Sequence, residues 1–142
     1  MLKDVKKAIF LFSGGKDATL GLYYMNQYIK EHSFDIELNP IMVTFPKHVY
    51  FNPDGSELEC FTTVKKFWKE QGVDLEILTP DADDFGDDLT GACKLCKSAR
   101  KSVVDAYLNN CEDGTALITG YTLYDALAYM DEICLVSDFS SD

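Results

Sequence analysis

The stretch AIFLFSGGKDAT, residues 8–19, joins an unbroken apolar run to a glycine turn that opens onto a helical pattern. The consecutive apolar residues Ala8 to Phe12 are typical of a strand buried on both faces, as in a parallel sheet. A second apolar run follows at residues 40–45, so this region predicts a strand, a helix and a parallel strand with a right-handed crossover. The helix is predicted over residues 16–32, where side chains recur at helical spacing at Leu20, Tyr23, Tyr24, Gln27 and Tyr28.

The alternation of strands and helices continues along the rest of the chain. A turn signal from Asn52 to Gly55 predicts a small surface hairpin. Further strands are predicted at residues 75–78, 116–120 and 133–136, with helices at about 60–71, from after Cys96 to about 109, and at 122–130. The predicted inward stripes of two of these helices are Cys60, Val64, Phe67 and Trp68, then Ala99, Val103, Ala106 and Tyr107.

This pattern predicts one α/β domain over residues 1–142, with a doubly wound, parallel five-stranded sheet and helices on both faces. In such sheets ligands bind at the carboxyl ends of the strands, where the winding direction reverses. Two predicted strands end in glycine there, one at residues 13–15 and one at Gly120. The aromatic side chains expected in the core are Tyr23, Tyr24, Tyr28, Phe67 and Trp68.

Composition excludes several classes of protein. The 142 residues are 46% hydrophobic and 13% aromatic, which excludes a disordered chain, and no apolar run approaches a membrane span. A charged start excludes a signal-peptide core, so a cytoplasmic protein with reduced cysteines is expected. A net charge of -11 argues against unaided binding to nucleic acid, apart from one basic run at Lys94, Lys97, Arg100 and Lys101.

The residues after the first strand carry the chemistry of an anion site. Gly14 and Gly15 allow a close backbone approach, and the following helix start attracts phosphate, with hydroxyl groups at Ser13 and Thr19. Lys16 can neutralise phosphate, and Asp17 suits a Mg²⁺ ion that bridges phosphate oxygens. The loop fits neither GxxxxGK[ST] nor GxGxxG. The alternative is a glycine turn before a capped helix, with no ligand.

These residues resemble the signature SGGxDS of the PP-loop superfamily, the ATP pyrophosphatases or adenine nucleotide alpha hydrolases. Ser13, Gly14, Gly15, Asp17 and Thr19 match, whereas Ala18 stands where the family has Ser. The resemblance implies that the loop, residues 13–19, holds the pyrophosphate part of ATP. It also implies attack of a substrate oxygen on the alpha-phosphate, release of pyrophosphate, and adenine bordered by Val43 and Thr44.

A second group of residues resembles the tRNA-thiolating branch of that superfamily. The pair Cys93 and Cys96 is followed by a basic pair and by Gly120, and a GHxxDD-like motif keeps Gly120 and Asp125 but has Tyr121 and Tyr124. The resemblance implies that Gly120 and Asp125 line the alpha-phosphate side. It further implies that the cysteine pair holds an iron–sulfur cluster with a third cysteine, Cys134 or Cys111, or carries a persulfide. A zinc clip and free thiols remain open alternatives.

The resulting expectation is an ATP- and Mg²⁺-dependent adenylating sulfurtransferase or ligase. Its acceptor is tRNA or a small carbonyl or amide compound, and a sulfur-donor or partner protein and a homodimer are open. The alternative is an ATP-binding regulatory or partner subunit without turnover, in which the cysteine pair is a structural metal clip. The residues expected to carry catalysis are Lys16, Asp17, Cys93, Cys96 and Asp125, with Asp17, Cys93, Cys96 and Cys134 as metal ligands.

Overall fold

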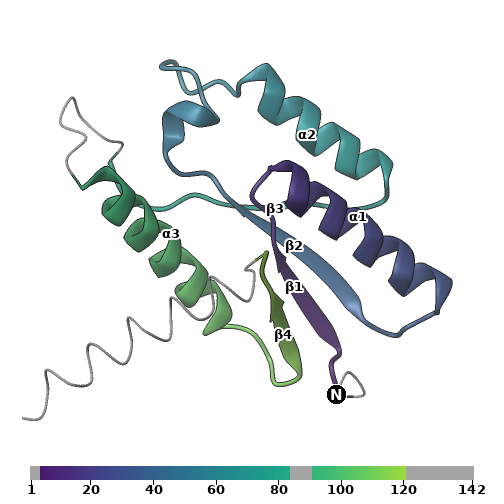
Figure 1. Cartoon of the computed structure of the whole chain (residues 1–142). Helices are drawn as coiled ribbons and strands as arrows, with labels where there is room; N and C mark the ends of the chain where they lie inside the picture. The colour runs from purple at the N-terminus through teal and green to yellow at the C-terminus, as the bar shows by residue number, and fades with distance from the viewer. Residues whose placement is uncertain (1–3, 84–90, 121–142) are drawn as a thin grey trace, which may run out of the picture.

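Four parallel strands form the sheet in a computed structural model that describes residues 4–83 and 91–120 (Figure 1). Their order is β3-β2-β1-β4, and the α/β class is confirmed. The predicted fifth strand at 133–136 and helix at 122–130 lie outside the described residues. The strands are β1 (Lys7–Leu11), β2 (Glu37–Val43), β3 (Glu76–Leu78) and β4 (Thr115–Ile118).

Helices cover both faces of the sheet, as the doubly wound pattern predicts. The helices α1 (Lys16–Glu31) and α2 (Glu59–Glu70) lie on one face, and α3 (Ala92–Leu108) lies on the other (Figure 1). The core accordingly has two halves, which β1 and β2 separate. One half gathers Phe10, Phe12, Leu22 and Trp68, and the other gathers Ile9, Ile41, Val43, Phe45 and Val104.

The strand order locates the point where the winding reverses. The chain steps from β1 to β2 to β3 in one direction, then crosses back through α3 to place β4 on the other side of β1. The crossover that leaves β1 runs through α1 on one face of the sheet, and the crossover that leads into β4 runs through α3 on the other face, so the crossovers on the two sides of β1 diverge (Figure 1). In a sheet of this kind that divergence makes the ligand-binding crevice.

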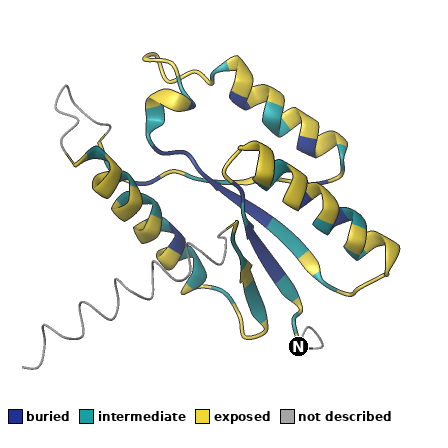
Figure 2. Ribbon diagram, viewed as in Figure 1, coloured by how far each residue is buried: buried dark blue, intermediate teal, exposed yellow. Residues whose placement is uncertain are grey.

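The aromatic prediction is wrong for four of its five members. Trp68 is buried and meets the ring of Phe12 edge-on at 5.7 Å, but Tyr23, Tyr24, Tyr28 and Phe67 are exposed (Figure 2). Helix α1 turns Leu22 and Asn26 toward the sheet instead of its tyrosines. A Cβ on Gly21 would lie 3.3 Å from Phe10, so small and aliphatic side chains fit the space under α1 better than tyrosine rings.

The buried face of α2 differs in part from the prediction, and that of α3 is confirmed except at Ala106. Helix α2 buries Phe61 and Trp68, with Val64 half-buried between them, whereas Cys60 is exposed. The end of this helix at Gly72, whose φ is +74°, is confirmed. Helix α3 begins at Ala92, so Cys93 and Cys96 lie within its first turns and do not precede it. It buries Val104 and packs Ala99, Val103 and Tyr107 against the core as predicted, whereas Ala106 is exposed.

The predicted hairpin is confirmed in a short form. A single antiparallel bridge joins Phe51 to Glu57 around the turn, and a 3-10 helix, η1 (Lys47–Val49), precedes it. Gly55 occupies the left-handed region with a φ of +83°. The segment from η1 to the turn packs Tyr50 against Phe61 in the first turn of α2, and it leaves the order of the sheet unchanged.

A polar network fastens α3 to the sheet near the amino ends of the strands. The Asn39 amide donates to the Tyr107 hydroxyl at 2.8 Å and to Glu76 Oε2 at 3.0 Å, and the Tyr107 hydroxyl donates to Glu76 Oε2 at 2.6 Å. Burial, followed by this bond to the carboxylate, raises the pKa of Tyr107 from 10.0 to about 12. The network therefore requires a neutral phenol.

We expect Tyr107→Phe to lower the free energy of unfolding by about 1 kcal/mol at neutral pH, because Glu76 and Asn39 lose a partner. The folded-state pKa is raised, so the stabilisation that the phenol gives is complete below its ordinary value of 10.0 and is lost as the pH rises through about 12. The difference between the variant and the wild type should consequently shrink in that range.

Urea unfolding at about pH 8 and about pH 11 measures this difference. Tyr24→Phe is the control, because its ring is 66% exposed and the substitution should change stability at neither pH. An equal deficit for Tyr107→Phe at both pH values would contradict a protonated hydroxyl in the network.

Candidate functional site

The loop after β1 has the backbone shape that an anion requires. Phe12 still donates its amide to the Ile41 carbonyl at 2.9 Å, and the chain then leaves the sheet and enters α1 at Lys16. Gly14 has a φ of +79°, and a Cβ there would lie 3.3 Å from Met42 Cε. Gly14 lies next to the N-cap residue Gly15, and glycine at this left-handed position lets the backbone turn sharply into α1 and leaves room for a close approach to it.

The start of α1 has no side-chain cap. Gly15 is the N-cap residue, and its own amide points to Ser13 Oγ at 3.4 Å. The amides of the first turn are therefore left for solvent or a ligand, where the helix dipole favours negative charge. Ser13, Lys16 and Asp17 are all exposed around this point, so a phosphate group can reach them.

Two members of the predicted loop have restricted roles. The Thr19 hydroxyl donates to the Gly15 carbonyl at 2.9 Å, so its oxygen remains only as an acceptor in this arrangement. Ala18 is half-buried and packs against the core on the α1 side. The position where the resembled signature has Ser thus faces inward, and Ala18 can offer only its backbone.

The carboxyl end of β2 forms a closed floor beside the loop. Val43, Thr44 and Phe45 are fully buried, so their side chains cannot lie against a ligand on the surface. The Thr44 amide donates to the Leu78 carbonyl at 2.9 Å, and its hydroxyl lies 2.8 Å from that of Thr79. Val43 and Thr44 can border an adenine only through their backbone or by shaping the edge of the crevice.

Thr79 is a residue that the sequence analysis did not single out. It follows β3 at the same register as Thr44 follows β2, because Val43 is paired with Leu78. The sequence does show a threonine near the end of each of two predicted strands, and this pattern could have drawn attention to Thr44 and Thr79. The pairing of those two strands is what turns the signal into a contact.

The cysteine pair lies at the same edge of the sheet, because α3 starts from the connection that leaves the carboxyl end of β3 (Figure 1). Cys93 is exposed, Cys96 is half-buried against the core under α3, and both are free thiols. The helix starts after Gly91, whose φ is +76°. Lys94 and Lys97 are exposed beside the pair.

The structure excludes Cys111 as a partner of this pair. From Cys96 the helix α3 continues to Leu108, a helical rise of about 18 Å, and Cys111 lies three residues beyond that end. Cys134 and Asp125 lie outside the described residues, and Gly120 is the last residue described. Within residues 4–83 and 91–120, no group of three or more potential metal-ligating side chains occurs.

Comparison with known proteins shows a likeness to a solved structure. No protein-family model and no curated protein matches the sequence. The U34-tRNA thiolase NcsA from Methanococcus maripaludis, solved with its 4Fe-4S cluster, superposes with a TM-score of 0.62 at 22% identity. The match covers 92% of this chain and 44% of the thiolase chain, so this chain spans less than half of the thiolase's length.

This likeness concerns the fold. The α/β fold expected from the sequence is confirmed in the described residues, and this chain shares that fold with the thiolase. The described part of the chain contains no helix with the length and apolarity of a membrane span.

We expect Gly14→Ala to weaken binding of inorganic pyrophosphate by roughly tenfold or more, because the loop amides lose their common orientation. It should also cost about 1 kcal/mol of stability, the penalty of a left-handed non-glycine residue. Gly55→Ala is the matched control, because Gly55 has a φ of +83° with no atom near its Cβ position. Isothermal titration and urea unfolding separate the two effects, and equal loss of pyrophosphate binding in both variants would contradict the assignment.

Proposed function

We propose that this chain is a PP-loop-type ATP-binding domain that activates an acceptor by adenylation, releases pyrophosphate and serves sulfur transfer to RNA. The observation that carries the proposal is the glycine loop at residues 13–17, which leaves the central strand at the point of reversed winding and enters an uncapped helix. The fold shared with a U34-tRNA thiolase supports the same reaction class.

The loop residues divide the work on the nucleotide. Amides in the first turn of α1 bind the beta- and gamma-phosphates, and Lys16 neutralises their charge. Asp17 is exposed next to those phosphates, and one carboxylate with phosphate oxygens is a typical Mg²⁺ ligand set. When bound, Mg²⁺ supplies charge neutralisation on the phosphate oxygens.

Adenylation then needs positioning more than proton transfer. The acceptor oxygen attacks the alpha-phosphorus, the bond to the beta-phosphate oxygen breaks, and pyrophosphate leaves with the electron pair of that bond. The loop stabilises the leaving pyrophosphate, since fixed amides and Lys16 meet the negative charge that develops there. Gly120 and Asp125 are assigned by resemblance to the alpha-phosphate side, with Asp125 beyond the described residues.

Cys93 and Cys96 are assigned to sulfur or metal. Cysteine sulfurs one helical turn apart suit iron or zinc as ligands. Cys134 is then the third cysteine, because the length of α3 removes Cys111 from reach. When bound, an iron–sulfur cluster supplies a site that can take up and pass on sulfur.

The acceptor is assigned as RNA through the exposed face of α3. Lys94, Lys97 and Lys101 follow one another at spacings of three and four residues, and all are exposed. Lys94 and Lys97 lie beside the cysteines, and Lys101 extends this basic stripe while it pairs with Asp105 on the same helix. A small carbonyl or amide acceptor is the alternative, and it would not need this stripe.

A second function has its own supporting observation. Ala18 turns inward where the resembled signature has a hydroxyl, and Tyr121 and Tyr124 replace two residues of the second motif. These departures favour an ATP-binding partner subunit that lacks turnover, with the cysteine pair as a metal clip.

Pyrophosphate release from ATP tests the main proposal. We expect Asp17→Ala to reduce the rate on the order of 100-fold, because the metal that neutralises the phosphates loses its carboxylate. Asp35→Ala is the control, since Asp35 is exposed in the connection from α1 to β2, at the opposite end of the strands. ATP binding without release by the wild type would favour the partner subunit, and absence of ATP binding would contradict both functions.

Anaerobic purification tests the role of the cysteines. We expect the wild type to carry iron and to absorb broadly in the visible range, and we expect Cys93→Ser and Cys96→Ser each to lose both features. Cys60→Ser is the matched control, because Cys60 is an exposed free thiol on a different helix. Stoichiometric zinc would favour the metal clip, and metal-free protein would contradict both metal assignments.

A further inference from the structure

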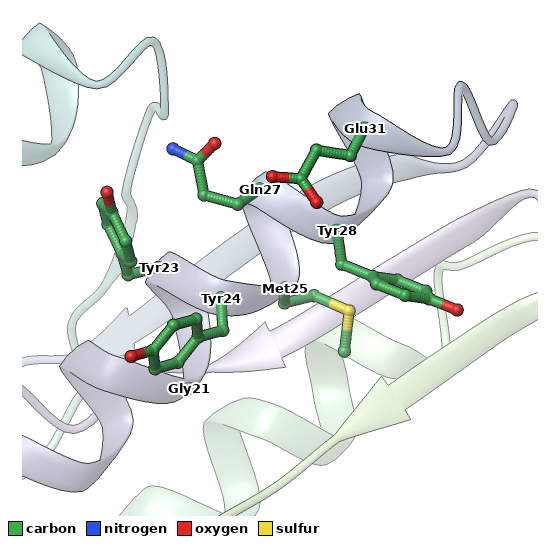
Figure 3. A pocket seen from close by; sticks show the side chains of 7 residues that line it. All are labelled: Gly21, Tyr23, Tyr24, Met25, Gln27, Tyr28 and Glu31. Carbon is green, nitrogen blue, oxygen red and sulfur yellow. The ribbon is translucent and has the colours of Figure 1, made fainter.

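The outward face of α1 carries a continuous aromatic stripe. Leu20, Tyr24 and Tyr28 follow one another at spacings of four residues and are 55%, 66% and 49% exposed. These positions lie on one side of a helix, opposite the buried residues Leu22 and Asn26. Figure 3 shows Tyr24 and Tyr28 reaching out from the same side of α1. The hollow along this side measures about 690 Å³ and is lined by Gly21, Tyr23, Tyr24, Met25, Gln27, Tyr28 and Glu31.

Such a stripe differs from scattered surface apolar residues. Single exposed leucines or tyrosines are normal, but large side chains repeated on one helix face mark a site of association. Helical spacing of the anchors is the pattern that another helix recognises when it packs alongside. The tyrosines also keep a polar group for the rim of such a contact.

Acidic side chains close both ends of this stripe. Asp17 precedes Leu20 by three residues and Glu31 follows Tyr28 by three, so both lie on the same face, and both are exposed. The two lysines of α1 are placed elsewhere. Lys30 donates to the Gln71 carbonyl at the end of α2, and Lys16 opens the helix in the glycine loop. Along this face of α1, an acidic residue at each end therefore flanks an apolar centre.

Charge decides between the candidates that could cover it. In a second copy packed antiparallel, Asp17 would face Glu31, and in a parallel pair each acid would face its own equivalent, so both arrangements bring like charges together. The chain's own residues 121–142 include Asp125, Asp131, Glu132, Asp138 and Asp142 but no lysine or arginine. Neither complements the acidic ends.

We propose that the outward face of α1 binds an amphipathic helix of another protein, whose apolar stripe spans about three turns and carries Lys or Arg at both ends. The apolar side chains of the partner would pack between Leu20, Tyr24 and Tyr28, and its basic ends would meet Asp17 and Glu31. This surface shares only Asp17 with the proposed magnesium site, since the rest of the stripe runs away from the glycine loop toward the far end of α1.

Two synthetic helical peptides of the same length test the proposal. Both carry leucine at helical spacing; one has lysine at both ends, and the other has glutamate there. Fluorescence anisotropy with the full chain, without nucleotide, should show the lysine peptide binding at least about tenfold more tightly, with the gap narrowing as salt rises.

Substitutions on the chain sharpen the test. Tyr24→Lys should lower the affinity for the lysine peptide by about tenfold or more, because it removes the central anchor and adds a positive charge that repels the lysines of the peptide. Leu95→Lys is its control, as Leu95 is 48% exposed on α3. Glu31→Lys should reduce the ratio of the affinities for the lysine and glutamate peptides by roughly fivefold or more. This substitution leaves Asp17 of the glycine loop unchanged.

Three results would overturn the proposal. The first is equal affinity for both peptides or binding to neither. The second is a dimer in sedimentation that Tyr24→Lys dissociates, which would assign the face to a second copy. The third is protection of Tyr24 and Tyr28 from nitration in the free monomer, which would mean that the chain covers its own stripe. Unchanged thermal unfolding of each variant shows that the fold is intact.

Discussion

The burial of β1 on both faces is the constraint on which the rest of the structure depends. Phe10 and Phe12 belong to the core half under α1 and α2, while Ile9 belongs to the half under α3. A strand in this position needs apolar residues without interruption, and it needs parallel neighbours on both sides. Only the ends of β1 can leave the core. Ser13 and the residues after it therefore emerge at the point where the crossovers on the two sides of β1 take opposite faces of the sheet.

The strands and helices could be predicted from the sequence because each rests on a local signal. Unbroken apolar runs located the strands, and Gly72 marked the end of α2 by its left-handed conformation. The phase of α1 could not be predicted, because both the stripe through Tyr24 and the stripe through Leu22 satisfy helical periodicity. What decides between them is the distance between α1 and β1, where Phe10 lies under Gly21. That distance is a tertiary property.

The site divides in the same way. The glycine loop could be predicted in residue identity and in shape, because Gly14 must adopt a conformation that few other residues tolerate. The cysteines could be predicted as a pair but not as part of α3, and only the straight length of that helix shows that Cys111 stands apart from them. Thr79 was missed because its meaning depends on which strand lies beside β2.

The hydroxyl contact between Thr44 and Thr79 ties the floor of the site to β3, which has three residues and is the outermost strand of the described sheet. Short outer strands open locally at a lower free energy than central ones, and their amides exchange with solvent first. Each opening of β3 releases the Thr44 amide from the Leu78 carbonyl as well. The rim where we assign the nucleotide base is thus tied to an outer strand, while the phosphate loop follows β1, which has neighbours on both sides in the described sheet.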